Sequence, residues 1–184
     1  MFALDYPNLP MKNLIVTAIA TLALALTVAT QASEVTAKLS GVHLCCPSCV
    51  KGVNKAVEGV QGVTATANQE QGIVTLTGPD TATVQKAADA LVAAGYFGKS
   101  SDPAIKLNSE TGAKDKNVKS LEVENVHLCC GKCVKAVNTA LGEVKGVTGN
   151  TAAKGATAFT VTGDFNDKEV FSALQKSGLT GQAK

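Results

Sequence analysis

Two short stretches of this sequence decide the fold: VHLCCPSCVKGV at residues 42–53 and VHLCCGKCVKAV at residues 126–137. They differ at only three positions, and together they hold all six cysteines and both histidines of the 184-residue chain. Self-similarity at a fixed separation indicates an internal repeat. The sequence therefore predicts two copies of one structural unit, each built around a group of cysteines.

The repeat extends well beyond the cysteines. Matching positions continue through 60–64 and 144–148, 74–78 and 159–163, and 91–95 and 174–178. Each copy spans about 65 residues, the size of a small domain. We predict a first domain over 33–100 and a second over 120–184. Residues 101–119 are rich in Ser, Asp, Pro, Gly, Asn and Lys, and this composition predicts a flexible linker.

Each copy shows the same order of elements. In the first copy, strands are predicted at 34–42, 63–67, 73–77 and 96–100, and helices around 50–60 and at 81–94. In the second copy, a strand at 121–126 and helices around 134–144 and at 167–177 repeat this order. The order βαββαβ is that of the ferredoxin-like fold, in which two helices cover one face of a four-stranded antiparallel sheet. The predicted fold class is therefore α+β, with two such domains in tandem.

The amino-terminal residues are typical of a targeting segment. Residues 14–28 form an unbroken apolar run that follows Met11 and Lys12, and small residues lead up to Ala32. This pattern predicts a secretory signal peptide cleaved after Ala32, with translation starting at Met11. The alternative is an uncleaved membrane anchor, although the run is shorter than the roughly twenty residues of a membrane span. We expect a soluble mature protein that is periplasmic or secreted.

The cysteines lie at a chemically specific place in each copy. Cys46 and Cys49, and likewise Cys130 and Cys133, form a Cys-x-x-Cys motif where a strand leads into the start of a helix. Unpaired amides at a helix start carry partial positive charge, which favours thiolate over thiol. Thiolates are soft ligands that prefer Cu(I), Zn(II) and other thiophilic ions. The motif therefore predicts a metal site, and its competing interpretation is a structural disulfide.

Taken together, these features resemble the heavy-metal-associated domain family, which includes copper chaperones, mercury-scavenging periplasmic proteins and the amino-terminal domains of transport ATPases. The resemblance covers 35–100 and 120–181 and rests on the Cys-x-x-Cys placement and on Ala94-Gly95-Tyr96 after the second helix. It implies that each cysteine pair binds one ion and passes it to a metal-transporting membrane protein or an acceptor domain.

The sequence departs from the Gly-Met-x-Cys-x-x-Cys pattern of that family at three positions in each copy. His43 and His127 replace the glycine, Leu44 and Leu128 replace the methionine, and Cys45 and Cys129 occupy the variable position. A third sulfur favours trigonal Cu(I), whereas three sulfurs with one imidazole form a closed zinc-type set. We expect Cu(I), with Zn(II) and Hg(II) as alternatives. Cys45 and Cys129 could instead point away from the site, and the two histidines could face solvent.

Composition bears on the other classes of function. The basic residues are all lysine, 17 against 15 acidic residues, and the net charge of +2 argues against a nucleic-acid binder. No hydrolytic or phosphate-binding motif is present in the sequence, so we expect a non-catalytic protein. Two alternatives stay open: a thiol–disulfide oxidoreductase that uses Cys46 and Cys49, and an interaction module linked by disulfides. The odd number of cysteines per copy weighs against both.

Overall fold

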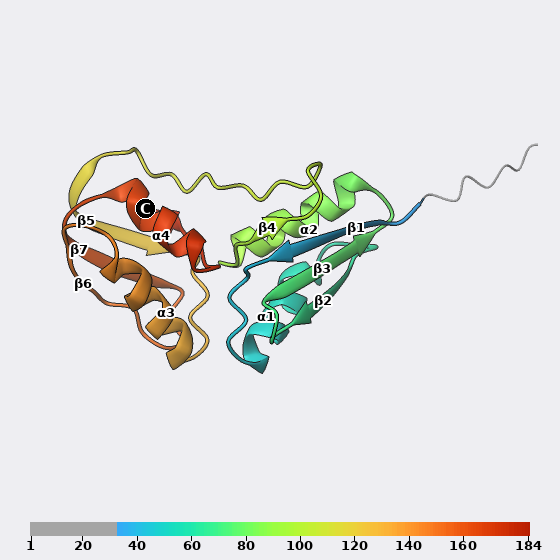
Figure 1. Cartoon of the computed structure of the whole chain (residues 1–184), viewed down its shortest axis with the longest axis horizontal. Coiled ribbons are helices and arrows are strands. Elements are labelled where there is room, and N and C mark those ends of the chain that lie inside the picture. Colours follow the sequence, from blue (N-terminus) through green and yellow to red (C-terminus); the bar gives the residue numbers. More distant parts are fainter. Residues whose placement is uncertain (1–32) are drawn as a thin grey trace, which may run out of the picture. The chain divides into compact units, whose positions relative to one another are not determined.

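The computed structural model describes residues 33–184 (Figure 1). The predicted signal peptide, its cleavage after Ala32 and the start at Met11 involve residues 1–32 and lie outside the described residues. Among residues 33–184, no helix combines the length and the apolar character needed to cross a membrane.

The described chain repeats one βαββαβ unit. The first half (33–100) contains β1 (Val35–Ser40), α1 (Pro47–Val57), β2 (Thr64–Asn68), β3 (Ile73–Gly78), α2 (Thr81–Ala93) and β4 (Lys99–Ser100). The second half (117–184) contains β5 (Asn117–Glu124), α3 (Gly131–Gly142), β6 (Val147–Asn150), β7 (Ala158–Asn166), α4 (Asp167–Lys176) and β8 (Gln182–Ala183). Each half forms a four-stranded antiparallel sheet, in the orders β2-β3-β1-β4 and β6-β7-β5-β8. The predicted α+β class with two ferredoxin-like domains is confirmed.

Local chemistry sets the start of each helix. Cys46 has extended backbone angles before α1, and Pro47 occupies the first turn, where its missing N–H leaves no hydrogen bond unmade. The side chain of Asp80 caps α2 by accepting a hydrogen bond from the backbone N–H of Thr83 at 2.7 Å. Asn166 caps α4 in the same way through the N–H of Lys168. Because α1 starts at the cysteine loop, its position fixes where the thiols lie.

The core of each half is built from aliphatic side chains of both layers. In the first half, Leu39 and Leu76 of the sheet are buried together with Val53 of α1 and Leu91 of α2. The second half adds three buried phenylalanines to the same arrangement. A Leu→Ala change at such positions costs about 2–5 kcal/mol. The packed sheets and helices therefore hold the ends of the loops that carry the cysteines in place.

The segment predicted as a flexible linker makes specific contacts with the first half. Gln85 of α2 donates to the carbonyl of Lys106 at 2.7 Å, and its side-chain oxygen accepts from the N–H of Lys106 at 2.8 Å. Ile105 is buried, with 1% of its side chain exposed. Polar composition suggested a solvated chain, but the Gln85 amide supplies partners for the backbone and Ile105 supplies an apolar anchor.

The later part of the same segment is bonded to the second half. The carboxylate of Asp167 accepts from the backbone N–H groups of Lys114 and Lys116, at 2.8 and 2.9 Å. The carbonyl of Thr111 accepts from the N–H of Ala183 at 2.7 Å. Strand β5 begins at Asn117 rather than near Leu121, so the second half starts inside the predicted linker. These bonds tether the segment to both halves.

The two halves meet where each second helix ends. The carbonyl of Gly178, after α4, accepts from the backbone N–H of His43, and the carbonyl of Gly95, after α2, accepts from that of Thr180. Tyr96 and Leu179 pair as an isolated antiparallel bridge. Both glycines have positive φ, +87° at Gly95 and +76° at Gly178. A Cβ at Gly95 would overlap the backbone of the loop at His127, and a Cβ at Gly178 that of the loop at His43. Each second helix therefore ends against the cysteine loop of the other half.

Candidate metal centre

The three cysteines of each loop occupy matching positions. Cys46 and Cys130 are the N-cap residues of α1 and α3, and Cys49 and Cys133 lie one turn further along, where they are fully buried. Cys45 and its counterpart Cys129 precede the caps and are half-buried. All six carry free thiols. The loop-to-helix placement predicted for the Cys-x-x-Cys motifs is thus the one the structure shows.

The sulfur atoms of the two loops converge on one cluster. The contacts that cross between the halves are Cys45–Cys130 at 3.4 Å, Cys45–Cys133 at 3.5 Å, Cys46–Cys129 at 3.6 Å, Cys49–Cys129 at 3.4 Å and Cys49–Cys133 at 3.9 Å. The sequence predicted one ion per domain and left open whether the two domains share an ion; the structure brings the sulfurs of both loops into one cluster. The reason is the backbone contact at Gly95 and Gly178, which brings the two loops face to face.

The spacing of the sulfurs fits ligands around an ion. Within each loop, the Cys46–Cys49 and Cys130–Cys133 separations are 3.8 and 3.9 Å. A disulfide would require about 2.05 Å. Four ligands at the Zn–S distance of about 2.3 Å in a tetrahedron lie about 3.8 Å from one another. The separations exclude disulfides and are compatible with sulfurs that share a thiophilic ion.

Both histidines lie beside the sulfurs. The donor atoms of Cys49, His127, Cys129 and Cys133 all lie within 4.8 Å of one another, and His43 stands in a similar group with two of the cysteines. Both imidazoles are half-buried, so neither is a fully solvent-facing side chain. The Nε2 atom of His43 is buried and has no hydrogen-bond partner. Burial lowers the pKa of His43, which favours the neutral imidazole that metals bind. We call the six sulfurs and these two imidazoles the shared centre.

Tyr96 belongs to the surroundings of the shared centre, a role that the sequence did not reveal. Tyr96 was noted in the sequence only as part of the Ala94-Gly95-Tyr96 ending, and the residue is buried, with 1% exposed. Its hydroxyl donates to the carbonyl of Cys49 at 2.9 Å and lies 3.1 and 3.2 Å from the two ring nitrogens of His127. A Cβ at Gly52 of α1 would overlap that hydroxyl. One sequence feature could have indicated a side chain packed against α1 at this point: the first copy has Gly52 where the second copy has Ala136.

Two thiols of the cluster have a lowered pKa, and both are helix N-caps. For Cys130, the backbone N–H of Cys133 is the main cause of the lowered pKa. For Cys46, burial raises the pKa, but the N–H of Cys49 and the thiol of Cys129 outweigh burial and lower it. These shifts agree with the effect expected of a helix start on a thiolate.

The other thiols are shifted in the opposite direction. Burial is the main cause that raises the pKa of Cys45 to about 12, and burial also raises that of Cys129. The pKa of Cys49 is raised first by its contact with the Cys133 thiol and then by burial. Closely spaced sulfurs resist joint ionisation unless a cation shares their charge. The arrangement is therefore suited to exchanging thiol protons for metal ions.

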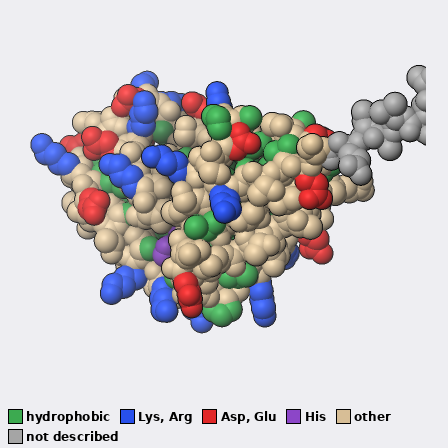
Figure 2. Space-filling view, turned by 45° about the vertical axis from the view of Figure 1, so that its right-hand side comes forward, with side chains coloured by type: hydrophobic (Ala, Val, Ile, Leu, Met, Phe, Trp, Pro, Cys, Tyr) green, Lys and Arg blue, Asp and Glu red, His purple; other side chains and the backbone are tan. Residues whose placement is uncertain are grey.

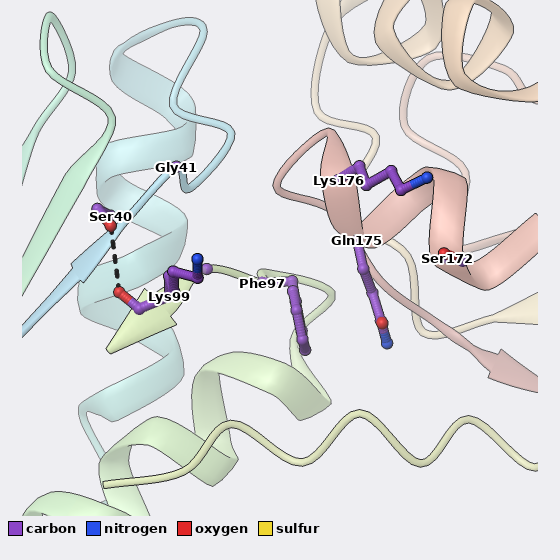
Figure 3. Close-up of a pocket in the computed structure, with 8 residues that line it drawn as sticks. Ser40, Gly41, Phe97, Lys99, Ser172, Gln175 and Lys176 are labelled. Carbon is purple, nitrogen blue, oxygen red and sulfur yellow. Dashed lines mark hydrogen bonds between the residues drawn. The ribbon is translucent and has the colours of Figure 1, made fainter. Parts of the chain in front are cut away.

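One hollow is lined by both halves, and a smaller one is lined by the second half alone. A cavity of about 540 Å³ is lined by Phe97 and Lys99 of the first half and by Gln175 and Lys176 of the second, and none of its lining residues is a cysteine or histidine (Figure 3). A smaller one of about 140 Å³ borders His127 and Cys129 under the loop at 155–157. The smaller hollow is the one that adjoins the shared centre.

On the face drawn in Figure 2, lysine side chains are interspersed with aspartate and glutamate.

The fold and the shared centre define a tandem ferredoxin-like protein whose two cysteine loops form one thiol-rich site. No family model matches the chain, and no curated protein matches it. Among solved structures, the soluble N-terminal domains of Bacillus subtilis CopA align over 83% of this chain and 95% of that chain, with 16% identity and a TM-score of 0.30. The first two RRM domains of yeast poly(U) binding protein Pub1 align over 82% and 98%, with 10% identity and a TM-score of 0.27. Similarities at this level do not indicate the function of this chain.

Proposed function

We propose that this protein binds thiophilic metal ions, Cu(I) foremost, at the shared centre and serves in metal scavenging or delivery. One observation carries the proposal: all six sulfurs and both imidazoles, which come from two distant stretches of sequence, meet within one small volume. Without metal, closely spaced thiols stay protonated, because neighbouring thiolates repel one another. A thiophilic cation favours their ionisation and binds the resulting thiolates.

Two donor arrangements within the shared centre point to different ions. The group of Cys49, His127, Cys129 and Cys133 is a Cys3His set, which suits tetrahedral Zn(II). The group of Cys45, Cys46 and Cys130 offers three sulfurs and suits trigonal Cu(I). We favour Cu(I) because sulfur outnumbers nitrogen three to one among the donors. Hg(II) and Cd(II) fit the same donors.

The wider role rests on the sequence. The apolar run at 14–28 supports export to the periplasm or the exterior, where a metal-binding protein meets incoming ions. The two low-pKa thiols Cys46 and Cys130 are half-exposed, and they are the donors best placed for handing an ion to thiolates of another protein. We propose a metal-transporting membrane protein or an acceptor domain as the recipient, and no catalytic role.

A thiol–disulfide oxidoreductase is the second candidate, and the lowered pKa of Cys46 and Cys130 favours it, because reactive thiols share that property. Against it, each of these thiols has two or more other sulfurs within 4 Å, which would compete for any mixed disulfide. A redox role predicts turnover of a reductant. A metal-binding role predicts thiols that become protected once an ion is added.

The test is native mass spectrometry of the reduced protein with Cu(I) and Zn(II) in competition. We expect bound Cu(I) and protection of the thiols from alkylation. The double change Cys49→Ser with Cys133→Ser, which removes the buried sulfur of each loop, should abolish tight binding. Ser48→Ala is the control, since Ser48 is exposed and lies between two cysteines. Unchanged metal binding in the double variant would show that the site assignment is wrong.

A further inference from the structure

The donors of the shared centre form three overlapping groups. The first contains Cys49, His127, Cys129 and Cys133, the second His43, Cys45 and Cys133, and the third Cys45, Cys46 and Cys130. Within each group the donor atoms lie within 4.8 Å of one another. Together the groups use every cysteine and histidine of the chain. Only Cys133 and Cys45 occur twice, and each of them joins two neighbouring groups.

We propose that the shared centre holds more than one ion, as a polynuclear thiolate cluster in which Cys45 and Cys133 bridge neighbouring ions. This inference rests on the proposed metal-binding function and specifies its capacity. A thiolate sulfur carries several lone pairs, so it can bind two soft ions at once. The Cys45 and Cys133 sulfurs are 3.5 Å apart, which lets both contact the same middle ion.

The number of donors argues against a single ion. Thiophilic ions such as Zn(II) take four protein ligands, and trigonal Cu(I) takes three. One ion in the group around His127 would leave Cys45, Cys46, Cys130 and His43 without a role. The Nε2 atom of His43 is already buried without a partner, which is unfavourable for a polar nitrogen. An ion in the middle group would take a ring nitrogen of His43 as a ligand.

Charge leads to the same conclusion. The six sulfurs are 3.4–3.9 Å from their neighbours, so they can all ionise only if cations lie beside all of them; around a single ion, the sulfurs that do not bind it would stay protonated. Like charges at such distances repel strongly in a half-buried site. Spreading several cations through the cluster places a positive charge next to every sulfur, and shared sulfurs reduce the number of thiolates required per ion.

The burial of the groups gives an order of filling. The group around His127 contains both fully buried sulfurs, Cys49 and Cys133, and offers four donors, so it should bind the first ion. The group of Cys45, Cys46 and Cys130 is half-buried throughout and offers three donors, so it should fill last. Ions added late are then the ones nearest to the surface and the first to leave.

The test uses 113Cd(II), a thiophilic ion with a nuclear spin, added to the reduced protein. We expect native mass spectrometry to show at least two Cd(II) per chain in excess metal, and 113Cd NMR to show coupling between cadmium nuclei through a bridging sulfur. Saturation at one Cd(II), or several signals without coupling, would overturn the inference but leave the proposed function intact. Absence of any bound Cd(II) would overturn both.

Two neighbouring cysteines provide matched variants. Cys45→Ser removes a bridging sulfur, and only one bound ion without coupling should remain. Cys46→Ser removes a terminal sulfur from the same half-buried loop, and at least two coupled ions should remain. Circular dichroism of each variant checks that both fold. An equal loss of ions in the two variants would contradict the bridging role of Cys45.

Discussion

The two halves of this protein have nearly the same cysteine loop but give its histidine different surroundings. In the second half, the ring of His127 is held by the hydroxyl of Tyr96, which arrives from the first half. In the first half, His43 has a buried nitrogen without a partner, and the residue equivalent to Tyr96 is the apolar Leu179. The difference shows that the sequence of the loop does not by itself determine the hydrogen bonding of its histidine. That hydrogen bonding depends on the residue that follows the second helix of the other half, which is Tyr96 for His127 and Leu179 for His43.

The loops also differ in what covers them. In the first half, the short turn between β2 and β3 supplies one bond, from the N–H of Val42 to the carbonyl of Gly72. In the second half, the longer connection between β6 and β7 supplies two, from Val126 to Thr157 and from Gly155 to Leu128. The first loop has its second bond to the other half, from the N–H of His43 to the carbonyl of Gly178, whereas both bonds of the second loop come from its own half. We expect the donor group around His127 to be the tighter binder.

The largest expected effect comes from the glycines at the junction. Gly95→Ala places a methyl group against the backbone at His127 in a left-handed conformation, and it should lower the free energy of unfolding by about 2–5 kcal/mol. Gly178→Ala should destabilise the protein similarly but weaken the first bound ion less, because it disturbs the loop of His43. Urea unfolding and Cd(II) titration measure the two effects.

The control for this prediction is Gly142→Ala at the end of α3, where an added Cβ meets nothing within 4 Å. It should change stability by at most about 1 kcal/mol, in the stabilising direction. If Gly95→Ala and Gly178→Ala lowered the affinity for the first ion equally, the two cysteine loops would not differ in their contribution to the first site.

The next effect separates the two histidines. His127→Ala removes one of four donors from the group that fills first, so the affinity for the first ion should fall by more than about 100-fold, the upper end of what losing an outer hydrogen-bond partner costs. His43→Ala should leave the first affinity nearly unchanged and weaken a later ion. Competition with a chromogenic chelator measures both affinities, and a stronger effect of His43→Ala would reverse the assignment.

A smaller effect is expected for Tyr96→Phe. The ring stays in place, but the hydrogen bond to Cys49 and the contact with His127 are lost. Because Tyr96 orients a ligand without binding the ion, the first affinity should fall by about 10–100-fold. The 113Cd chemical shift of the first signal should also change, a response that a purely structural role would not produce. Unchanged shift and affinity would mean that Tyr96 only packs.

The smallest effect concerns pH in the reduced, metal-free protein. The pKa of Cys45 is raised to about 12 from 9.0, so the folded state keeps a proton that the unfolded state loses. Its stabilising contribution is present below about pH 9 and declines as the pH rises from 9 toward 12. Cys45→Ser should make urea unfolding less sensitive to pH in this window.

Cys46 provides the opposite case for comparison. Its pKa is lowered, so its stabilising contribution is present above the ordinary value near 9 and is lost as the pH falls through the folded-state pKa. Cys46→Ser should therefore remove a rise in stability with pH below about 9. Identical pH profiles for Cys45→Ser and Cys46→Ser would contradict the two directions of shift.

Much of the fold followed from the repeated pattern. The sequence predicted a helix around 50–60 after the first cysteine motif, and α1 spans Pro47–Val57, so it begins a few residues earlier, at the cysteines. Edge strands were less predictable: the strand expected at 96–100 is only Lys99–Ser100, because Tyr96 pairs instead with Leu179 of the other half. Local pattern cannot reveal a pairing partner that lies 83 positions away.

The sequence also identified the donor residues, but it did not predict that the donors of the two copies lie in one cluster. Gly95 and Gly178 were visible as residues that end helices. Nothing in their local sequence indicates that each lies against the other cysteine loop. The hydrogen bonds of Asp167 to Lys114 and Lys116 were hidden for the same reason, since a carboxylate at a helix start looks like an ordinary cap until its distant partners are known.

The tethering segment has a consequence for how the protein behaves on dilution. Two separate domains that share an ion would fall apart as their concentration dropped, because each would have to find the other. Here the segment between Ser100 and Asn117, which has bonds to both halves, keeps the two cysteine loops at an effective local concentration in about the millimolar range or above. For the metal binding proposed above, closure around an ion would therefore not depend on the concentration of the protein, because both loops belong to one chain.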